Sequence, residues 1–153
     1  MSEPRGFTLL EILLVVAAIA ILAAIVIIAI NPGKQLAETR DAQRRSDVNA
    51  LSSAIAQYVI KKGSYPEISE GEDCFSATAP SSETYGVCAT GVSCGSVALD
   101  NYLVPDFIPA IPQDPSGTND DYSGYTVMRL PNNRVLVCAP LTEEANGIIS
   151  VSR

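Results

Sequence analysis

The chain has 153 residues, which is room for one domain of ordinary size with an appendage and excludes a large multidomain enzyme. Hydrophobic residues make up 47% and charged residues 18% of the sequence, and the formal net charge is -7. Because nucleic-acid phosphates attract a basic face, this acidic balance argues against a nucleic acid as a primary partner. The hydrophobic fraction suits a compact soluble domain only if the apolar residues are segregated in one part of the chain.

The apolar residues are concentrated in one run near the amino terminus. Between Phe7 and Ile30 the only ionisable residue is Glu11. At about 1.5 Å per residue, a helix of this length reaches roughly 36 Å and crosses a hydrocarbon core of about 30 Å. The run is longer than the apolar region of a secretory signal, and the preceding "MSEPRG" balances one Arg with one Glu. It therefore predicts a membrane-spanning helix rather than an ordinary signal peptide.

The following segment, residues 31–63, is typical of an amphipathic helix. Asn31 can cap a helix and Pro32 suits its first position, so we expect the apolar helix to be interrupted near Asn31 and restarted. An apolar stripe at three- and four-residue spacing predicts a buried face formed by Val48, Leu51, Ile55, Tyr58 and Val59. Arg44 and Asp47 belong to a run of alternating charges, which we expect to form a solvated face.

Short elements separated by Gly, Pro, Ser and Asn follow, over residues 64–153. "YTVMRL" and "RVLVCA", separated by "PNN", predict a β-hairpin, and "GIISVS" predicts a third strand. Residues 74–94 are expected to be mostly loop. A short helix capped by Ser96 is expected over "SVALDNYLV", followed by a proline-rich extended connector.

Four cysteines occur in this region: Cys74, Cys88, Cys94 and Cys138. Their spacing matches neither a zinc site nor a dithiol redox site, and the chain has no His. Two disulfides are the leading interpretation, which places the region in an oxidising compartment, with unpaired thiols as the alternative. All three connectivities stay open, and the pairing of Cys74 with Cys88 and of Cys94 with Cys138 is slightly favoured.

Glu11 needs an explanation, because a carboxylate at membrane depth costs about 2.5 to 3.5 kcal/mol on insertion scales. Cleavage between Gly6 and Phe7 would create an α-amino group in the same layer of the bilayer. In two helices displaced by about one turn, the amine of one chain would meet Glu11 of the next, which neutralises both charges and fixes the stagger. An incidental glutamate that reaches toward water is the alternative.

The stretch "GFTLLEILLVVAAIAILAAI" resembles the N-terminal motif of type IV pilins and of the pseudopilins of type II secretion, and a looser resemblance continues to about residue 67. The resemblance implies a pilin-like fold of the α+β class, in which a long N-terminal helix packs its distal half on a small C-terminal antiparallel sheet. It implies four segments: a leader (1–6), a transmembrane and filament-core helix (7–30), an amphipathic helix (31–63) and a disulfide-stapled head (64–153).

The resemblance also implies roles and partners. A prepilin peptidase would cleave after Gly6 and methylate Phe7, and Glu11 would contact the amine of a neighbouring subunit. Other implied partners are pilin subunits, the membrane before assembly, and a membrane platform driven by a cytoplasmic ATPase, with no cofactor on this chain. The N-terminus would be cytoplasmic in a single-pass inner-membrane protein that later enters an extracytoplasmic filament. The positive-inside rule favours the opposite orientation, because basic residues follow the span at Lys34, Arg40, Arg44 and Arg45.

The expected function is that of a structural subunit of a type IV pilus-like filament, with a type II secretion pseudopilin or a monomeric membrane-anchored binding module as alternatives. The absence of His, of G-x-S-x-G and of a phosphate-cradling glycine loop leads us to expect no catalytic residues. Some pseudopilins carry calcium in a loop like "QDPSGTNDDYSG". The spacing does not match an EF-hand and an Asx-rich turn explains it equally well, so no metal ligand is assigned among Asp114, Asp120 and Asp121.

Overall fold

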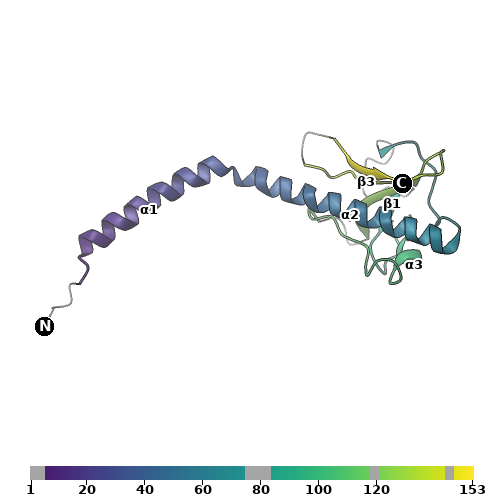
Figure 1. The fold of residues 1–153 in the computed structure, drawn as a ribbon, viewed down its shortest axis with the longest axis horizontal. Helices are drawn as coiled ribbons and strands as arrows, with labels where there is room; N and C mark the ends of the chain where they lie inside the picture. Colours follow the sequence, from purple (N-terminus) through teal and green to yellow (C-terminus); the bar gives the residue numbers. More distant parts are fainter. Residues whose placement is uncertain (1–5, 75–83, 118–120, 144–146) are drawn as a thin grey trace. The chain divides into compact units, whose positions relative to one another are not determined.

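A computed structural model describes residues 6–74, 84–117, 121–143 and 147–153 (Figure 1). The chain forms two compact units, Met1–Leu36 and Ala37–Arg153. The first unit contains helix α1, Leu9–Ile30. The second contains most of helix α2, Pro32–Lys62, together with a four-stranded sheet and the short helix α3, Asp100–Leu103. We call this second unit the head.

Helix α1 ends where the sequence predicts an interruption. Asn31 adopts a left-handed conformation with φ 47°, which Asn tolerates better than most residues. Pro32 then begins α2, and its missing N–H costs little at a first helical position. Helix α2 ends after Lys62, where Gly63 takes a φ of 74° and its N–H donates to the Val59 carbonyl at 2.8 Å. The helix therefore ends at the boundary expected for the amphipathic segment, residues 31–63.

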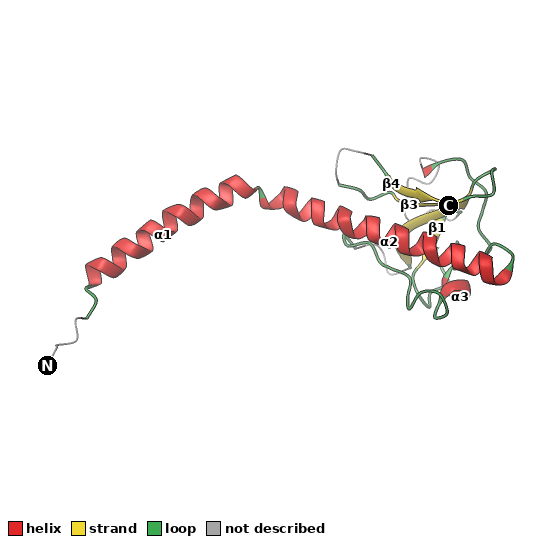
Figure 2. Ribbon diagram, in the orientation of Figure 1, coloured by secondary structure: helices red, strands yellow, loops and turns green. Residues whose placement is uncertain are grey.

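The sheet is antiparallel, with the strand order β1-β2-β3-β4 (Figure 2). Its strands are Gly86–Cys88, Tyr122–Arg129, Val135–Ala139 and Ile149–Ser152. The predicted hairpin is β2 and β3, whose register pairs Arg129 with Val135, and the third predicted strand is β4. Asn133 in the connecting turn has a φ of 62°, a conformation that suits Asn.

The core of the head lies between α2 and one face of the sheet (Figure 2). The predicted stripe of α2 is confirmed: Val48, Leu51 and Ile55 are at most 1% exposed and share one cluster with β-strand residues such as Tyr125 and Val137. Burying each such aliphatic side chain contributes about 1.5 to 3 kcal/mol. A smaller cluster on the other face of the sheet is formed by Cys74, Met128 and Cys138.

Two local expectations are wrong. Strand β1 lies inside the region expected to be loop, because its three residues pair with β2 and are buried, which no periodicity in so short a segment signals. Helix α3 begins at Asp100 rather than near Ser96, and Leu99 occupies its N-cap position without a side-chain cap. The Val97 N–H donates to the Gly86 carbonyl, and the Val97 carbonyl accepts from the Cys88 N–H. These two hydrogen bonds to β1 keep the chain extended before the helix.

All four cysteines are in disulfides, but the favoured pairing is wrong. Cys74 bonds to Cys138 and Cys88 bonds to Cys94. Cys138 follows Val137, which faces α2, so the alternation of a strand places its side chain on the other face of the sheet, beside Cys74. Cys88 ends β1, and the chain turns back within six residues so that the Cα of Cys94 lies 5.5 Å from that of Cys88.

Candidate assembly site

Three of the predicted site residues, Gly6, Phe7 and Glu11, lie within six consecutive residues at and just before the start of α1. Gly6 and Phe7 lie just before the helix, and the Phe7 side chain is 79% exposed. Thr8 is the N-cap: its Oγ1 accepts a hydrogen bond from the backbone N–H of Glu11 at 3.2 Å. This role of Thr8 was not among the predictions from the sequence, although Thr-x-x-Glu is the signature of a capping box.

Glu11 lies in the first turn of α1 and is exposed. Within the described part of the chain its carboxylate has no ion-pair partner and does not bond back to the N-cap. A favourable interaction with the positive end of the helix dipole contributes about 0.3 to 1 kcal/mol. Inserting a carboxylate into a membrane costs about 2.5 to 3.5 kcal/mol. The interaction of Glu11 with the helix dipole is smaller than this cost, so it does not by itself account for a glutamate at this position.

The rest of α1 is an uncovered apolar surface. None of its 22 residues is buried in the chain, and large aliphatic side chains are exposed along its whole length. Among the described residues, α1 is long and apolar enough to cross a membrane. An apolar surface of this extent exceeds what a soluble monomer normally exposes, so lipid or other protein chains must cover it.

The head contains a charge cluster around the buried Arg44 side chain, which we call the Arg44 cluster; its members are Arg44, the buried Asp41 and Asp114, and the more exposed Ser116 and Glu143. The Arg44 side chain is 0% exposed. Its Nε and Nη2 donate to the two carboxylate oxygens of Asp114 at 2.7 and 2.9 Å, and Nη2 also donates to Ser116. Nη1 donates to Asp41 at 2.7 Å and to Glu143 at 3.2 Å. One guanidinium therefore holds α2 to two loops of the head.

The ionisation of the cluster follows from these bonds. Burial by itself would raise the pKa of Asp114, but hydrogen bonds from Arg44 and Ser116 outweigh it, and the pKa is lowered. The pKa of Glu143 is lowered mainly by its hydrogen bonds with Arg40, which donates to both carboxylate oxygens at 2.8 Å. Both groups are therefore carboxylates at neutral pH, as the charge of Arg44 requires.

Another buried acid, Asp47, lies one turn beyond Arg44 along α2. The Tyr125 hydroxyl donates to its Oδ2 at 2.7 Å and Gln43 Nε2 donates to its Oδ1 at 2.8 Å. Burial raises the pKa of Asp47, because these neutral donors compensate only part of the lost hydration. Burial and the neighbouring carboxylate also raise the pKa of Tyr125, so its hydroxyl keeps its proton.

The expectation of a solvated charged face is therefore wrong for Asp41, Arg44 and Asp47, which are at most 6% exposed. A signal was present in the sequence: Asp41 and Arg44 continue the three- and four-residue spacing of the stripe at Val48 and Leu51. The apolar stripe stops there because the loops that cover this part of α2 present polar partners, and spacing alone does not reveal those partners.

Asp114, in the acidic loop considered for calcium, binds Arg44 of α2 instead. The Asp114 carboxylate is 0% exposed and is bonded by Arg44 and Ser116. Asp120 lies outside the described residues. Within the described ranges no group of three or more potential metal ligands occurs. Arg44, a cation supplied by the chain itself, lies against Asp114.

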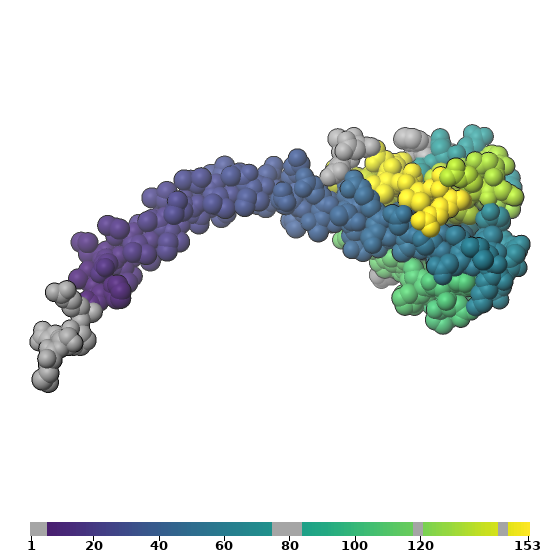
Figure 3. Space-filling model, viewed as in Figure 1, coloured from purple at the N-terminus to yellow at the C-terminus, as the bar shows by residue number. Residues whose placement is uncertain are grey.

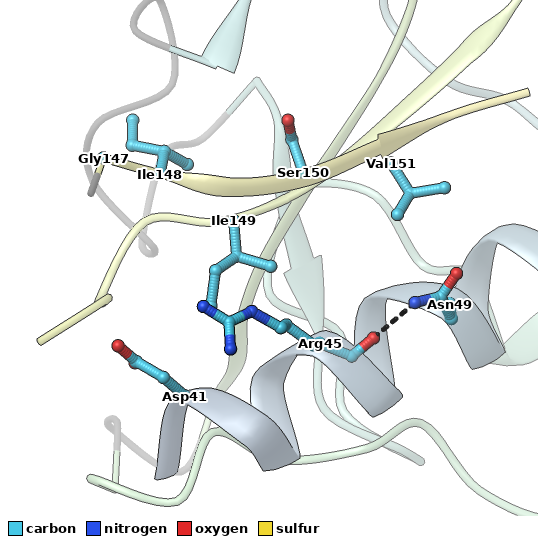
Figure 4. Close-up of a pocket in the computed structure, with 8 residues that line it drawn as sticks. All are labelled: Asp41, Arg45, Asn49, Gly147, Ile148, Ile149, Ser150 and Val151. Carbon is cyan, nitrogen blue, oxygen red and sulfur yellow. Dashed lines mark hydrogen bonds between the residues drawn. The ribbon is translucent and has the colours of Figure 1, made fainter. Parts of the chain in front are cut away.

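A groove of about 360 Å³ lies between α2 and β4 (Figure 4). Arg45 extends toward Ile149, and Asn49 Nδ2 donates to the Arg45 carbonyl at 2.8 Å. Ser150 points away from α2. None of the predicted site residues lines this groove, so it takes no part in the site at α1.

The arrangement of an uncovered apolar helix before a small antiparallel head defines the class of pilin-like subunits. Residues 1–30 match the prokaryotic N-terminal methylation motif. The chain is 30% identical over 119 residues to the type II secretion system core protein G of Klebsiella pneumoniae, a match that covers 78% of this chain and 74% of the relative. For the Pectobacterium carotovorum subsp. carotovorum protein of the same name, identity is 30% over 75% of this chain and 64% of the relative.

The protein of this name from Vibrio cholerae is 27% identical over 80% of this chain and 72% of its own length. No solved structure matches the chain significantly. The chain belongs to the type IV pilin and pseudopilin family. It is a pilin-like structural subunit, as the sequence predicted, and its relatives imply assembly with other pilin subunits.

Proposed function

We propose that the chain is a prepilin that is cleaved after Gly6, methylated on Phe7 and assembled into the filament of a type II secretion-like system. The names of the relatives support the secretion system. The match of residues 1–30 to the methylation motif supports the processing. The partners in this proposal are a prepilin peptidase, a membrane platform and its cytoplasmic ATPase, while the chain itself has a structural and non-enzymatic role.

The position of Glu11 carries the proposal. Its carboxylate is exposed in the first turn of an apolar helix and has no partner among the described residues, while Phe7 lies one helical turn away. Cleavage before Phe7 supplies a cation at a matching depth. The amine of one subunit pairs with Glu11 of its neighbour, which sets the axial stagger of the apolar helices in the filament.

In this proposal the N-terminus is cytoplasmic and the head is outside. The two disulfides support an oxidising compartment for the head. Two of the four basic residues that follow the span also have a structural explanation, because Arg44 is buried among carboxylates and Arg40 is paired with Glu143. Their presence after the span is thus accounted for by the folding of the head.

Substitution of Glu11 tests the proposal. Glu11→Ala and Glu11→Gln remove the charge, so membrane insertion and leader removal continue while filaments are lost or severely reduced. Electron microscopy of fibres and fractionation of membranes measure the two effects. Glu72→Ala, which removes an exposed carboxylate of the head, is the matched control and leaves filaments unchanged. Normal filaments from Glu11→Ala would refute the pairing.

Mass spectrometry of the mature chain tests the processing independently. The expected species begins at an N-methylated Phe7. A chain that retains Met1 in cells with an active prepilin peptidase would refute the cleavage. Secretion of a reporter substrate by the host system, lost on deletion of the chain, distinguishes a secretion filament from a surface pilus, in which fibres would be lost without a secretion defect.

A further inference from the structure

A second, smaller groove lies on the head where the last turns of α2 meet the C-terminus. Its walls are α2 side chains from Ser52 to Ile60, Tyr65, the start of β3 at Val135, and Arg153. Figure 3 shows α2 and the C-terminal residues side by side on one face of the head. The groove encloses about 210 Å³, which is below the roughly 300 to 1,000 Å³ of small-molecule pockets, so its size suits protein side chains better than a ligand.

The lining of this groove is that of a protein contact surface. Ile60 is 85% exposed at its edge, an unusual position for a large aliphatic residue in a soluble head. Ala56, one turn earlier, is small enough to let a neighbouring helix approach closely. The isolated chain therefore leaves apolar surface uncovered at the edge of this groove.

The mostly apolar lining of the groove suits an apolar segment as its occupant. Arg153 is its only charged lining residue, and the Arg153 guanidinium donates to Ser53 Oγ at 3.0 Å. The described chain has one long segment that is apolar on every side and buried nowhere, namely α1. A contact between two different surfaces, the groove of one copy and α1 of another, repeats without closing and so builds a fibre.

We infer that this groove receives helix α1 of a second copy of the chain. The inference rests on the proposed function, in which copies assemble through α1, and it adds the surface of the head against which the neighbouring helix packs. Ile60 and Val59 contact aliphatic side chains of the incoming helix, and Ala56 sets the distance of approach. The apolar surface of α1 thus exchanges lipid for protein as a subunit leaves the membrane.

Photo-crosslinking on purified fibres identifies the occupant directly. A photoreactive benzophenone amino acid is placed at Ile60, and the irradiated fibres are digested with trypsin. Because no Lys or Arg lies between Arg5 and Lys34, α1 is released in one peptide that ends at Lys34. The expected product joins this peptide to the α2 peptide of a different copy. The same amino acid at exposed Asn132 is the control and gives no such product.

Two groove variants test the consequence for assembly. Ile60→Asp places a charge in the groove and Ala56→Trp fills it, so each reduces fibre yield at least tenfold, while Ile60→Leu retains it. Both disulfides and the melting temperature of the subunit stay unchanged, which separates assembly from folding. Crosslinks from Ile60 only to head peptides, or normal fibres from both variants, would overturn the inference. If Glu11→Ala still abolishes fibres in that case, the proposed function stands and only the groove assignment fails.

Discussion

Arg44 and Asp114 form a two-point contact in the head, with Nε and Nη2 of the guanidinium donating to both carboxylate oxygens although 70 positions separate the residues. Both side chains are 0% exposed. The contact fixes the loop around Asp114 against α2, and Glu143 joins a second loop to the same guanidinium. The buried half of α2 is therefore held by aliphatic packing at Val48 and beyond, and by one arginine before it.

We expect Arg44→Met to lower the free energy of unfolding by about 3 to 5 kcal/mol, because it leaves Asp41 and Asp114 buried without their cation. Chemical denaturation of the full chain in detergent, followed by circular dichroism, measures the loss. Arg45→Met changes the neighbouring, exposed arginine and is expected to cost no more than about 1 kcal/mol. Equal effects of the two substitutions would contradict the structural role of Arg44.

The stability of the head is expected to decrease in acid through Asp114. Its pKa is lowered in the folded chain, so its stabilising contribution is complete above the ordinary aspartate pKa of about 3.9 and is lost as the pH falls through the lower folded-state value. Asp47 acts in the opposite direction, because its pKa is raised on folding and its protonation favours the folded state. Asp114→Asn should therefore show a weaker loss of stability in acid than the unsubstituted chain. Denaturation curves between pH 2 and 7 measure the difference, and parallel curves would exclude this role of Asp114.

The two disulfides are expected to contribute unequally to stability. Cys74 and Cys138 are 64 positions apart, whereas Cys88 and Cys94 are 6 apart. Because a longer closed loop restricts the unfolded chain more, the chain-entropy account gives about 4 kcal/mol for the first and about 2 kcal/mol for the second. Paired Cys→Ala variants compared by denaturation test the ranking. A larger loss from the Cys88 and Cys94 pair would show that local geometry, not loop closure, dominates.

Thr8 is expected to support assembly without being essential. Thr8→Ala removes the oxygen that accepts from the Glu11 N–H and should destabilise the first turn of α1 by about 0.5 to 2 kcal/mol. Fibre yield should fall, but less than for Glu11→Ala, and Thr8→Ser should restore it because the hydroxyl is kept. A Thr8→Ala chain that assembles as poorly as Glu11→Ala would indicate a role beyond capping.

Much of the fold was predictable because its signals are local. The apolar run of α1, the Asn31–Pro32 break, the stripe of α2 and the β2–β3 hairpin each depend on residues within a few positions of one another. Glu11 is conspicuous in the same way, as the single ionisable residue of an apolar helix. Thr8 was predictable too, since its capping signature is complete in the sequence.

Long-range relationships were decided by tertiary structure alone. The disulfide pairing depends on which face of the sheet Cys138 occupies, and β1 exists because β2 lies beside it. Arg44 is buried because loops far along the chain bring Asp114 and Glu143 to it. By itself the sequence determined where α1 ends, where α2 begins and ends, and which side of α2 is apolar, since these follow from local backbone geometry and hydration. Which polar groups meet in the interior was decided only by folding, because their partners are distant along the chain and become neighbours only when the core forms.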